Sequence, residues 1–172
     1  MIQFGSNPLI MKKIHLFGKD ILFSEKYKNE HFYMQHGSTS TYTHSLAVTY
    51  VSIILAEKLG ISIDMRSLIR GALLHDYFLY DWHIRDRHHW FHGYTHAARA
   101  LENAKRDFII NHIENEIIRT HMFPLNLTKF PTCREAFIVS LADKICAGCE
   151  TIRIASYTEN MIKGIPSNKD II

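Results

Sequence analysis

The strongest constraint on the fold of this chain is a pair of apolar segments with helical period, over residues 43–59 and 64–74. Thr43 can cap the first segment, and Gly60 can end it in the left-handed conformation that glycine adopts readily. Asp64 is a favourable N-cap residue for the second segment. Because only a few residues separate the two segments, we predict two antiparallel helices joined by a short turn.

The remainder of the chain shows further helical segments and no convincing strand. Two of the expected helices begin with the spacing of a capping box, in which two side chains bond reciprocally to the backbone of the first turn. Asn111 with Glu114 and Thr132 with Glu135 have this spacing. The expected helices cover residues 20–33, 94–108, 114–122 and 133–157. The sequence therefore predicts the all-α class, as a single bundle of five to seven helices.

The chain is expected to form one domain over residues 1–172, because it contains no linker and no internal repeat. Residues 1–18 are expected to be a loosely held start, and residues 160–172 are expected to be peripheral. Loops are expected where periodicity is absent, over residues 37–43 and 81–91.

The composition indicates a globular protein and argues against two classes of partner. Hydrophobic residues make up 47% of the 172 residues and charged residues 22%, which supplies enough apolar material for one core. The net charge of +3 includes no run of five or six like charges, so we expect no nucleic-acid interface. No N-terminal segment combines a basic end with a long apolar run, so we expect no leader sequence. No apolar stretch reaches about 18 residues, so we expect no membrane segment. Three cysteines make no disulfide framework, and we expect a reducing, cytoplasmic location.

Histidine is the residue type whose abundance needs a chemical reason. The chain has 12 histidines, and five of them lie between His83 and His96. Histidine is the commonest protein ligand for metals. The most informative local pattern is Leu73-Leu74-His75-Asp76, in which an apolar helix ends in two adjacent groups that bind divalent metals. Adjacent helical residues diverge by about 100°, so this helix end could offer a nitrogen to one metal and a carboxylate to two. Taken alone, the dipeptide is more often a cap beside a surface group.

Two further residues give this dipeptide a context. His44 lies at the start of the first helix, which the antiparallel arrangement brings near the end of the second, so we expect His44 to meet His75 and Asp76. Asp143 lies within an apolar helical segment, where an unpaired carboxylate would be costly to bury. We therefore expect Asp143 to be paired or to bind a metal.

The order His44, His75-Asp76, Asp143 resembles the H…HD…D signature of the HD superfamily of metal-dependent phosphohydrolases. The resemblance covers roughly residues 35–150 and implies an all-helical bundle with metals held by these four residues. The resemblance extends to the residues around these positions, in the segments Gln35-His36-Gly37, His44-Ser45-Leu46-Ala47-Val48, Leu73-Leu74-His75-Asp76 and Leu141-Ala142-Asp143-Lys144.

Two further segments resemble the two-metal members of that superfamily, such as the symmetrical diadenosine tetraphosphate hydrolases of bacteria. His92-Gly93 followed by Ala97 resembles their HG-plus-Ala segment, and His121 resembles their fifth ligand. His96 lies four residues after His92 on the same helical face, and it could replace His92 as the ligand, support a ligand or contact phosphate. Those hydrolases have a small residue at the matching position, which leaves the substrate open. The resemblance implies a dinuclear centre held by His44, His75, Asp76, His92, His121 and Asp143. A mononuclear member of the superfamily would need only His44, His75, Asp76 and Asp143, and this alternative stays open.

This resemblance predicts an enzyme that uses metal-activated hydroxide to cleave a phosphoester or phosphoanhydride of a nucleotide or similar small molecule. Asp76, as the carboxylate between the metals, and His75 are the candidate catalytic residues. The resemblance implies two divalent ions. Nitrogen and oxygen ligands without a thiolate favour iron or manganese for these ions, while zinc, cobalt and nickel also fit. The candidate substrate-binding residues are His36, Arg85, His96 and Lys144.

Two other functions stay open from the sequence. Some two-iron HD proteins oxidise their substrates, and the same six ligands serve that chemistry. A regulatory domain could keep the bundle and its metals without turnover, although such a domain would be expected to lose ligands. We expect a small phosphorylated substrate as the partner of a monomer or homodimer.

Overall fold

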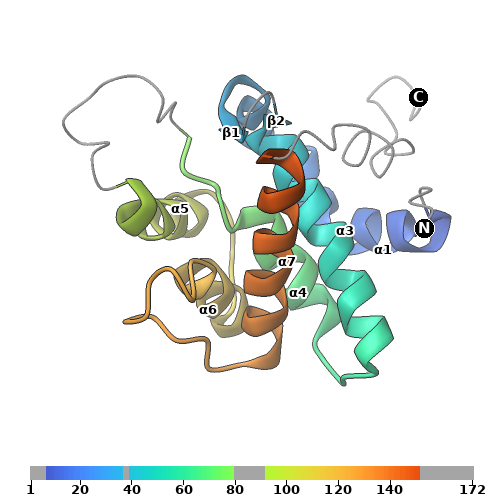
Figure 1. Cartoon of the computed structure of the whole chain (residues 1–172). Coiled ribbons are helices and arrows are strands. Elements are labelled where there is room, and N and C mark those ends of the chain that lie inside the picture. Colours follow the sequence, from blue (N-terminus) through green and yellow to red (C-terminus); the bar gives the residue numbers. More distant parts are fainter. Residues whose placement is uncertain (1–6, 37–38, 80–91, 152–172) are drawn as a thin grey trace, which may run out of the picture.

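A computed structural model describes residues 7–36, 39–79 and 92–151, without the side chains of residues 36 and 92–95. These residues form a bundle of helices with one small two-stranded sheet (Figure 1), which confirms the all-α class. The elements are α1 (Pro8–Leu22), α2 (Glu25–Lys28), the 3-10 helix η1 (Asn29–Phe32), β1 (Met34–His36), β2 (Thr39–Ser40), α3 (Thr41–Leu59), α4 (Met65–Leu74), α5 (His92–Asp107), α6 (His112–Thr120) and α7 (Arg134–Thr151).

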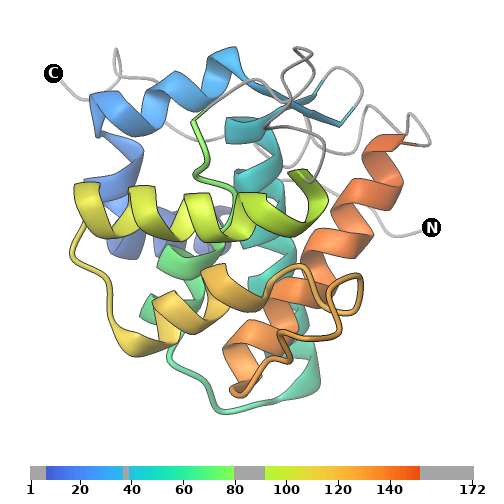
Figure 2. The same cartoon turned by 90° about the vertical axis from the view of Figure 1, so that its left-hand side faces the viewer.

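The centre of the bundle is made by α3, α4, α6 and α7. In Figure 1, α7 runs beside α3 across the front, with α5 and α6 on one side and α1 on the other. Figure 2 looks onto the side where α5 crosses the bundle and packs against α6. Helices far apart in the sequence therefore meet around one core, whose residues include Leu46, Leu73, Ile117 and Val139.

The predicted pair of helices at the centre is confirmed, with one change at its start. The side chain of Ser40, and not that of Thr43, caps α3 by accepting a hydrogen bond from the backbone N–H of Thr43. Gly60 ends α3 with a φ of 61°, in the left-handed region that suits glycine. The side chain of Asp64 caps α4, as expected, by accepting from the N–H of Ser67.

The expectation of a loosely held start is wrong for residues 8–18, which belong to α1. Asn7 caps this helix, and proline occupies its first turn, where the missing N–H has no helical partner to lose. The side chains of Ile10, Ile14 and Ile21 share the buried face of α1. Packing of this face against α4 orders the segment.

Three other expectations need correction. The helix expected over residues 20–33 is divided, because α1 ends at Leu22 and two short helices follow. The expected loop at 37–43 includes β2, which pairs antiparallel with β1. The box expected from Thr132 and Glu135 does not form: Thr132 donates to Glu116, and Glu135 accepts from the N–H of Asp64.

The other expected capping box, formed by Asn111 and Glu114 at the start of α6, is confirmed. Among the described residues, no helix combines the length and the apolar composition needed to cross a bilayer.

Candidate metal centre

Six side chains with metal-binding atoms meet at the end of the bundle where α3 begins. The helix termini explain much of this convergence, because α4 and α6 both end at this point. His75 and Asp76 follow α4 directly, and His121 follows α6 directly. The other members lie in the first turn of α3, in α5 and in the middle of α7: His44, His96 and Asp143. All six are buried, at no more than 5% exposure.

The six residues form two sets of three. In the first set, His44, His75 and Asp143 offer ligand atoms that all lie within 4.8 Å of one another. His44 Nε2 is 3.1 Å from Asp143 Oδ1, and His75 Nε2 is 3.9 Å from the same oxygen. Two nitrogens and an oxygen at these distances could share one cation.

The second set consists of Asp76, His96 and His121 and meets the same distance limit. Asp76 Oδ1 is 3.4 Å from His96 Nε2 and 3.3 Å from His121 Nε2. The two imidazole nitrogens are 2.9 Å apart. Two lone pairs at that separation repel each other unless a proton or a cation lies between them.

Asp76 connects the two sets through its two carboxylate oxygens. Oδ1 faces His96 and His121 of the second set. Oδ2 lies 3.3 Å from His75 Nε2 and 3.8 Å from His44 Nε2 of the first set. This orientation is the one that a carboxylate bridging two cations requires.

Hydrogen bonds fix which nitrogen the histidines present to the centre. His75 Nδ1 donates to the carbonyl of Ala72 at 2.7 Å, and His121 Nδ1 donates to that of Ile118 at 2.9 Å. Because a carbonyl oxygen can only accept, Nδ1 carries a proton in both rings, and in the neutral ring Nε2 is the nitrogen with the lone pair. Both rings therefore turn a metal-binding nitrogen inward.

His44 is oriented by a carboxylate instead of a carbonyl. Its Nδ1 lies 2.9 Å from Glu150 Oε2, and its Nε2 faces Asp143. Burial disfavours the charged form of His44, but hydrogen bonds with Asp143 and Glu150 outweigh this and raise its pKa to about 10. Without a metal, a proton on His44 supplies positive charge between the two carboxylates.

At His121 burial is the stronger effect. It lowers the pKa of this histidine to about 4, although the attraction of Asp76 opposes the shift. Burial also opposes ionisation of Asp76, but its imidazole neighbours, His75 first, hold the pKa of this carboxyl well below its usual range. The second set therefore contains neutral imidazole at His121 and ionised carboxylate, which are the states that bind metals.

A second observation also indicates that the atoms of the two sets suit divalent cations. His75 Nε2 and Asp76 Oδ1 are buried and have no hydrogen-bond partner within the described part of the chain. Both atoms point into the sets just described, and unpartnered buried polar atoms are costly. A cation in each set would give both atoms a partner.

Comparison with known proteins gives one family. The sequence model of the HD domain family matches residues 41–148, from the first residue of α3 to the last turns of α7. The chain belongs to the HD domain family. No curated protein and no solved structure gave a match in the other two comparisons. An HD domain is typical of metal-dependent hydrolases, and the buried histidines and aspartates of this HD domain form possible metal sites.

Within the HD domain, the structure brings together five of the six ligands implied by the sequence, together with His96. The sixth, His92, begins α5, and its side chain lies outside the described atoms. Lys144 lies at the rim of the first set, where Nζ donates to Asp143 Oδ2 at 2.6 Å and to the carbonyl of His121 at 2.9 Å. The side chain of His36 and all of Arg85 lie outside the described part of the chain.

Sequence reasoning assigned no role to two residues that hold the ligands in place. Gln35 of β1 donates from Nε2 to Asp76 Oδ2, and no periodic pattern marks it. Glu150 lies seven residues after Asp143, which is two turns along the same helical face. That spacing could have identified Glu150 as a neighbour of the centre.

Proposed function

We propose that this HD domain is a phosphohydrolase that uses two divalent cations to cleave a phosphoester or phosphoanhydride bond of a nucleotide or similar small molecule. The first set, His44, His75 and Asp143, would hold one ion, and the second set, Asp76, His96 and His121, would hold the other. The orientation of Asp76, with one oxygen toward each set, is the observation that carries this proposal.

Two cations at these positions would lower the pKa of a bound water and neutralise the charge on the phosphoryl oxygens. The protein residues supply the rest. Imidazole and carboxylate ligands fit manganese, iron, zinc, cobalt or nickel better than calcium. Lys144 places an ammonium group beside Asp143 with a partly exposed side chain, so we propose that it contacts the substrate phosphate.

The test uses protein stripped of metal, reloaded with manganese, and assayed for phosphate release on a panel of nucleotides. We expect Asp76→Ala to abolish release, because the change removes the oxygens that face both sets. His112→Ala, an exposed histidine at the start of α6, is the matched control and should behave as wild type.

Failure of every phosphorylated compound to release phosphate would contradict the proposal. Metal-dependent consumption of oxygen by the same preparation would favour the two-iron oxygenase as the alternative.

A further inference from the structure

Three hydrogen bonds hold the segment from Tyr27 to Gln35 next to the six-residue centre. Tyr27 donates from its hydroxyl to the carbonyl of Leu73, two residues before His75, at 2.9 Å. The carbonyl of Tyr33 accepts from the N–H of Thr41, at the start of α3, at 2.8 Å. Gln35 donates to Asp76 itself.

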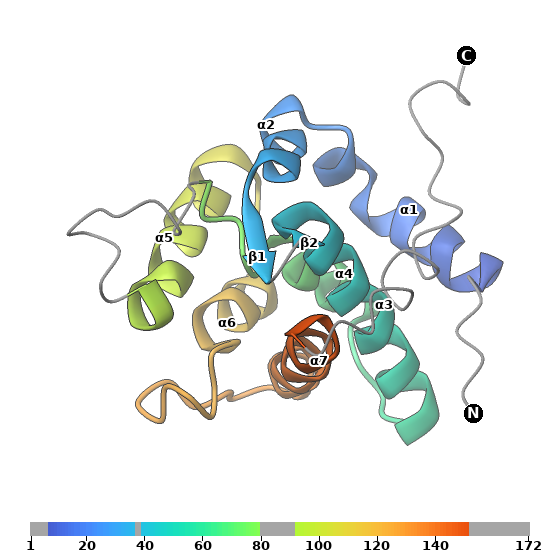
Figure 3. The ribbon, with the colours of Figure 1, turned by 45° about the horizontal axis from the view of Figure 1, so that its top comes forward.

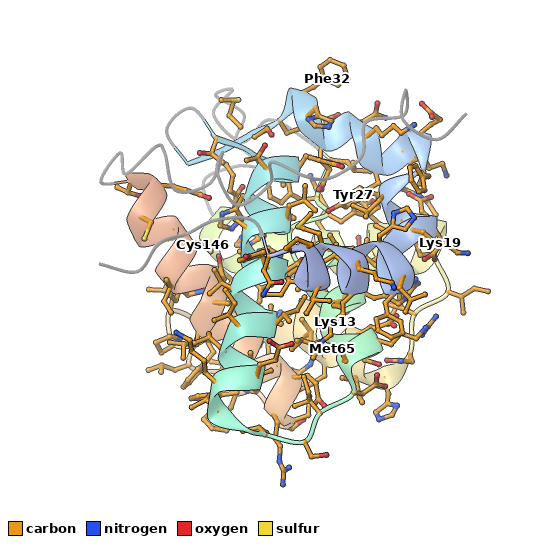
Figure 4. The ribbon with its side chains drawn as sticks, turned by 90° about the vertical axis from the view of Figure 1, so that its right-hand side faces the viewer. Lys13, Lys19, Tyr27, Phe32, Met65 and Cys146 are labelled. Atoms are coloured by element: carbon orange, nitrogen blue, oxygen red, sulfur yellow. The ribbon has the colours of Figure 1, made fainter. Side chains whose placement is uncertain are left out.

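Figure 3 shows α2 and β1 at the end of the bundle where α3 begins. In Figure 4, Phe32 projects outward from this segment, whereas Tyr27 points toward the helices. The segment therefore covers the centre with one side and faces solvent with the other.

Glu30 is the acidic residue of this segment that turns inward. It is 0% exposed, and neither of its carboxyl oxygens has a hydrogen-bond partner among the residues that the structure describes. Glu25, by contrast, has a side chain that is 87% exposed. A buried carboxyl without partners destabilises the fold, so Glu30 needs a reason beyond packing.

Glu30 lies near the centre but outside its two sets. Asp76 and His44 are close enough to shift the pKa of Glu30 in opposite directions, although burial has the larger effect and raises it well above the usual range. Among the described residues, the groups able to share a cation do not include Glu30. Glu30 lies in η1, between Tyr27, which bonds to the end of α4, and Gln35, which bonds to Asp76. A molecule bound at the centre is therefore the candidate partner for its carboxyl.

The chemistry of this position selects the kind of group that would bind. A carboxyl accepts a hydrogen bond from an alcohol hydroxyl whether or not it carries a proton itself, whereas a phosphate dianion has no proton to donate to an unpartnered oxygen. Gln35 of the same segment adds another buried acceptor, its Oε1, which has no partner in the described ranges of the chain.

We propose that Glu30 binds a hydroxyl group on the organic part of the substrate whose phosphate lies at the metal centre. This inference rests on the proposed phosphohydrolase function and narrows its substrates to phosphate compounds that carry a hydroxyl, such as those of sugars or glycerol. Glu30 would then set specificity for the organic part, while the two sets and Lys144 bind the phosphate.

The test measures binding of ligands by calorimetry, using the full chain loaded with manganese. Glycerol 3-phosphate and propyl phosphate have the same three-carbon chain and differ in two hydroxyl groups, and inorganic phosphate reports the metal centre alone. We expect wild type to bind glycerol 3-phosphate roughly fivefold more tightly than propyl phosphate, the effect of about one hydrogen bond. Glu30→Met should remove this preference and leave the affinity for inorganic phosphate unchanged.

Two further variants separate binding from folding. Glu30→Gln keeps an acceptor and a donor and should retain the preference, and the exposed Glu25→Gln should match wild type. Metal-free Glu30→Met should also melt at a higher temperature than wild type, because it removes a buried carboxyl without partners. A purely structural role for Glu30 predicts a lower melting temperature.

The inference is overturned if wild type binds inorganic phosphate but binds both organic phosphates equally, or if Glu30→Met keeps the preference. These two outcomes leave the proposed function standing. Absence of binding by all three ligands would instead contradict the proposed function, and this inference with it.

Discussion

Among the single residues of the centre, His44 lies between two carboxylates that face different nitrogens of its ring. Asp143 faces the ring nitrogen that points into the centre, and Glu150 faces the nitrogen that points away from it. The side chain of Glu150 is 1% exposed, so water competes little for this bond. A carboxylate behind a metal-binding histidine fixes its tautomer and makes it a stronger ligand.

Glu150→Ala should therefore weaken metal binding at the first set by about 10–100-fold while the second set keeps its affinity. Glu150→Gln should lose less, because its amide oxygen still accepts from Nδ1–H. Competition with a chelator measures both affinities, and nitrogen NMR of the imidazoles reports the tautomer of His44. Equal affinities in Glu150→Ala and wild type would contradict a positioning role.

His96→Ala should reduce bound manganese from two ions per chain toward one, because it removes one of the three ligands of the second set. Elemental analysis of protein dialysed against manganese measures this content, with exposed His112→Ala as the control. Unchanged content in His96→Ala would mean that another group, such as His92, completes the second set.

The sequence placed several members of the centre together for a physical reason. His44, His75 and Asp76 lie at the ends of two helices whose capping residues and short turn fix their pairing. The choice between His92 and His96 could not be made in this way. The two histidines share one helical face, and the orientation of α5 in the bundle decides which one reaches Asp76.

At the scale of elements, α4 begins at a capping residue and ends at the centre. Asp64 accepts from the N–H of Ser67 at 3.0 Å and from its hydroxyl at 2.7 Å. The backbone bond from Ser67 is the main reason that the pKa of Asp64 lies below its ordinary value of 3.8. The ionised form of Asp64 is therefore the one that stabilises the fold.

Asp64→Ala should lower the free energy of unfolding by about 1 kcal/mol near pH 7. Because the folded-state pKa is depressed, this contribution is present above about pH 4 and is lost as the pH falls through the folded-state value. Urea unfolding at pH 7 and at pH 3 measures the difference. Asp64→Asn, a cap without charge, should show a much weaker dependence on pH, and an equal dependence would contradict this account.

The first helix has a helical pattern of apolar residues that a glycine interrupts. Ile10, Ile14 and Ile21 share its buried face, while Gly18 is a poor helix former within it. Packing favours glycine at position 18, since a Cβ atom there would lie 2.5 Å from Leu73 Cδ1 of α4 and the leucine side chain would have to shift. Close contact with α4 favours glycine at this point, and this contact cannot be read from α1 alone.

At the scale of the whole molecule, Arg70 ties together elements from different parts of the chain. This residue of α4 is 2% exposed. It donates to Asp20 of α1, to Glu114 of α6 at 3.0 Å, and to the carbonyl of Ile109 before α6 at 3.1 Å. Buried charges paired in this way become costly when one partner is removed.

Arg70→Ala should therefore lower the free energy of unfolding by about 3–5 kcal/mol, because Glu114 would stay buried without its main partner. Arg66 also approaches Glu114, at 3.4 Å, but its side chain is 54% exposed. Arg66→Ala should cost less than about 1 kcal/mol. Chemical denaturation of both variants measures their free energies of unfolding. Similar losses of stability in the two variants would contradict the assignment of Arg70 as the main partner of Glu114.

We propose that five helices of this HD domain deliver six ligands to two cations bridged by Asp76. Anomalous diffraction from crystals of manganese-loaded protein locates such cations. We predict two peaks, one among His44, His75 and Asp143 and one among Asp76, His96 and His121, with Asp76 contacting both. A single peak, or a peak outside these two sets, would contradict the account.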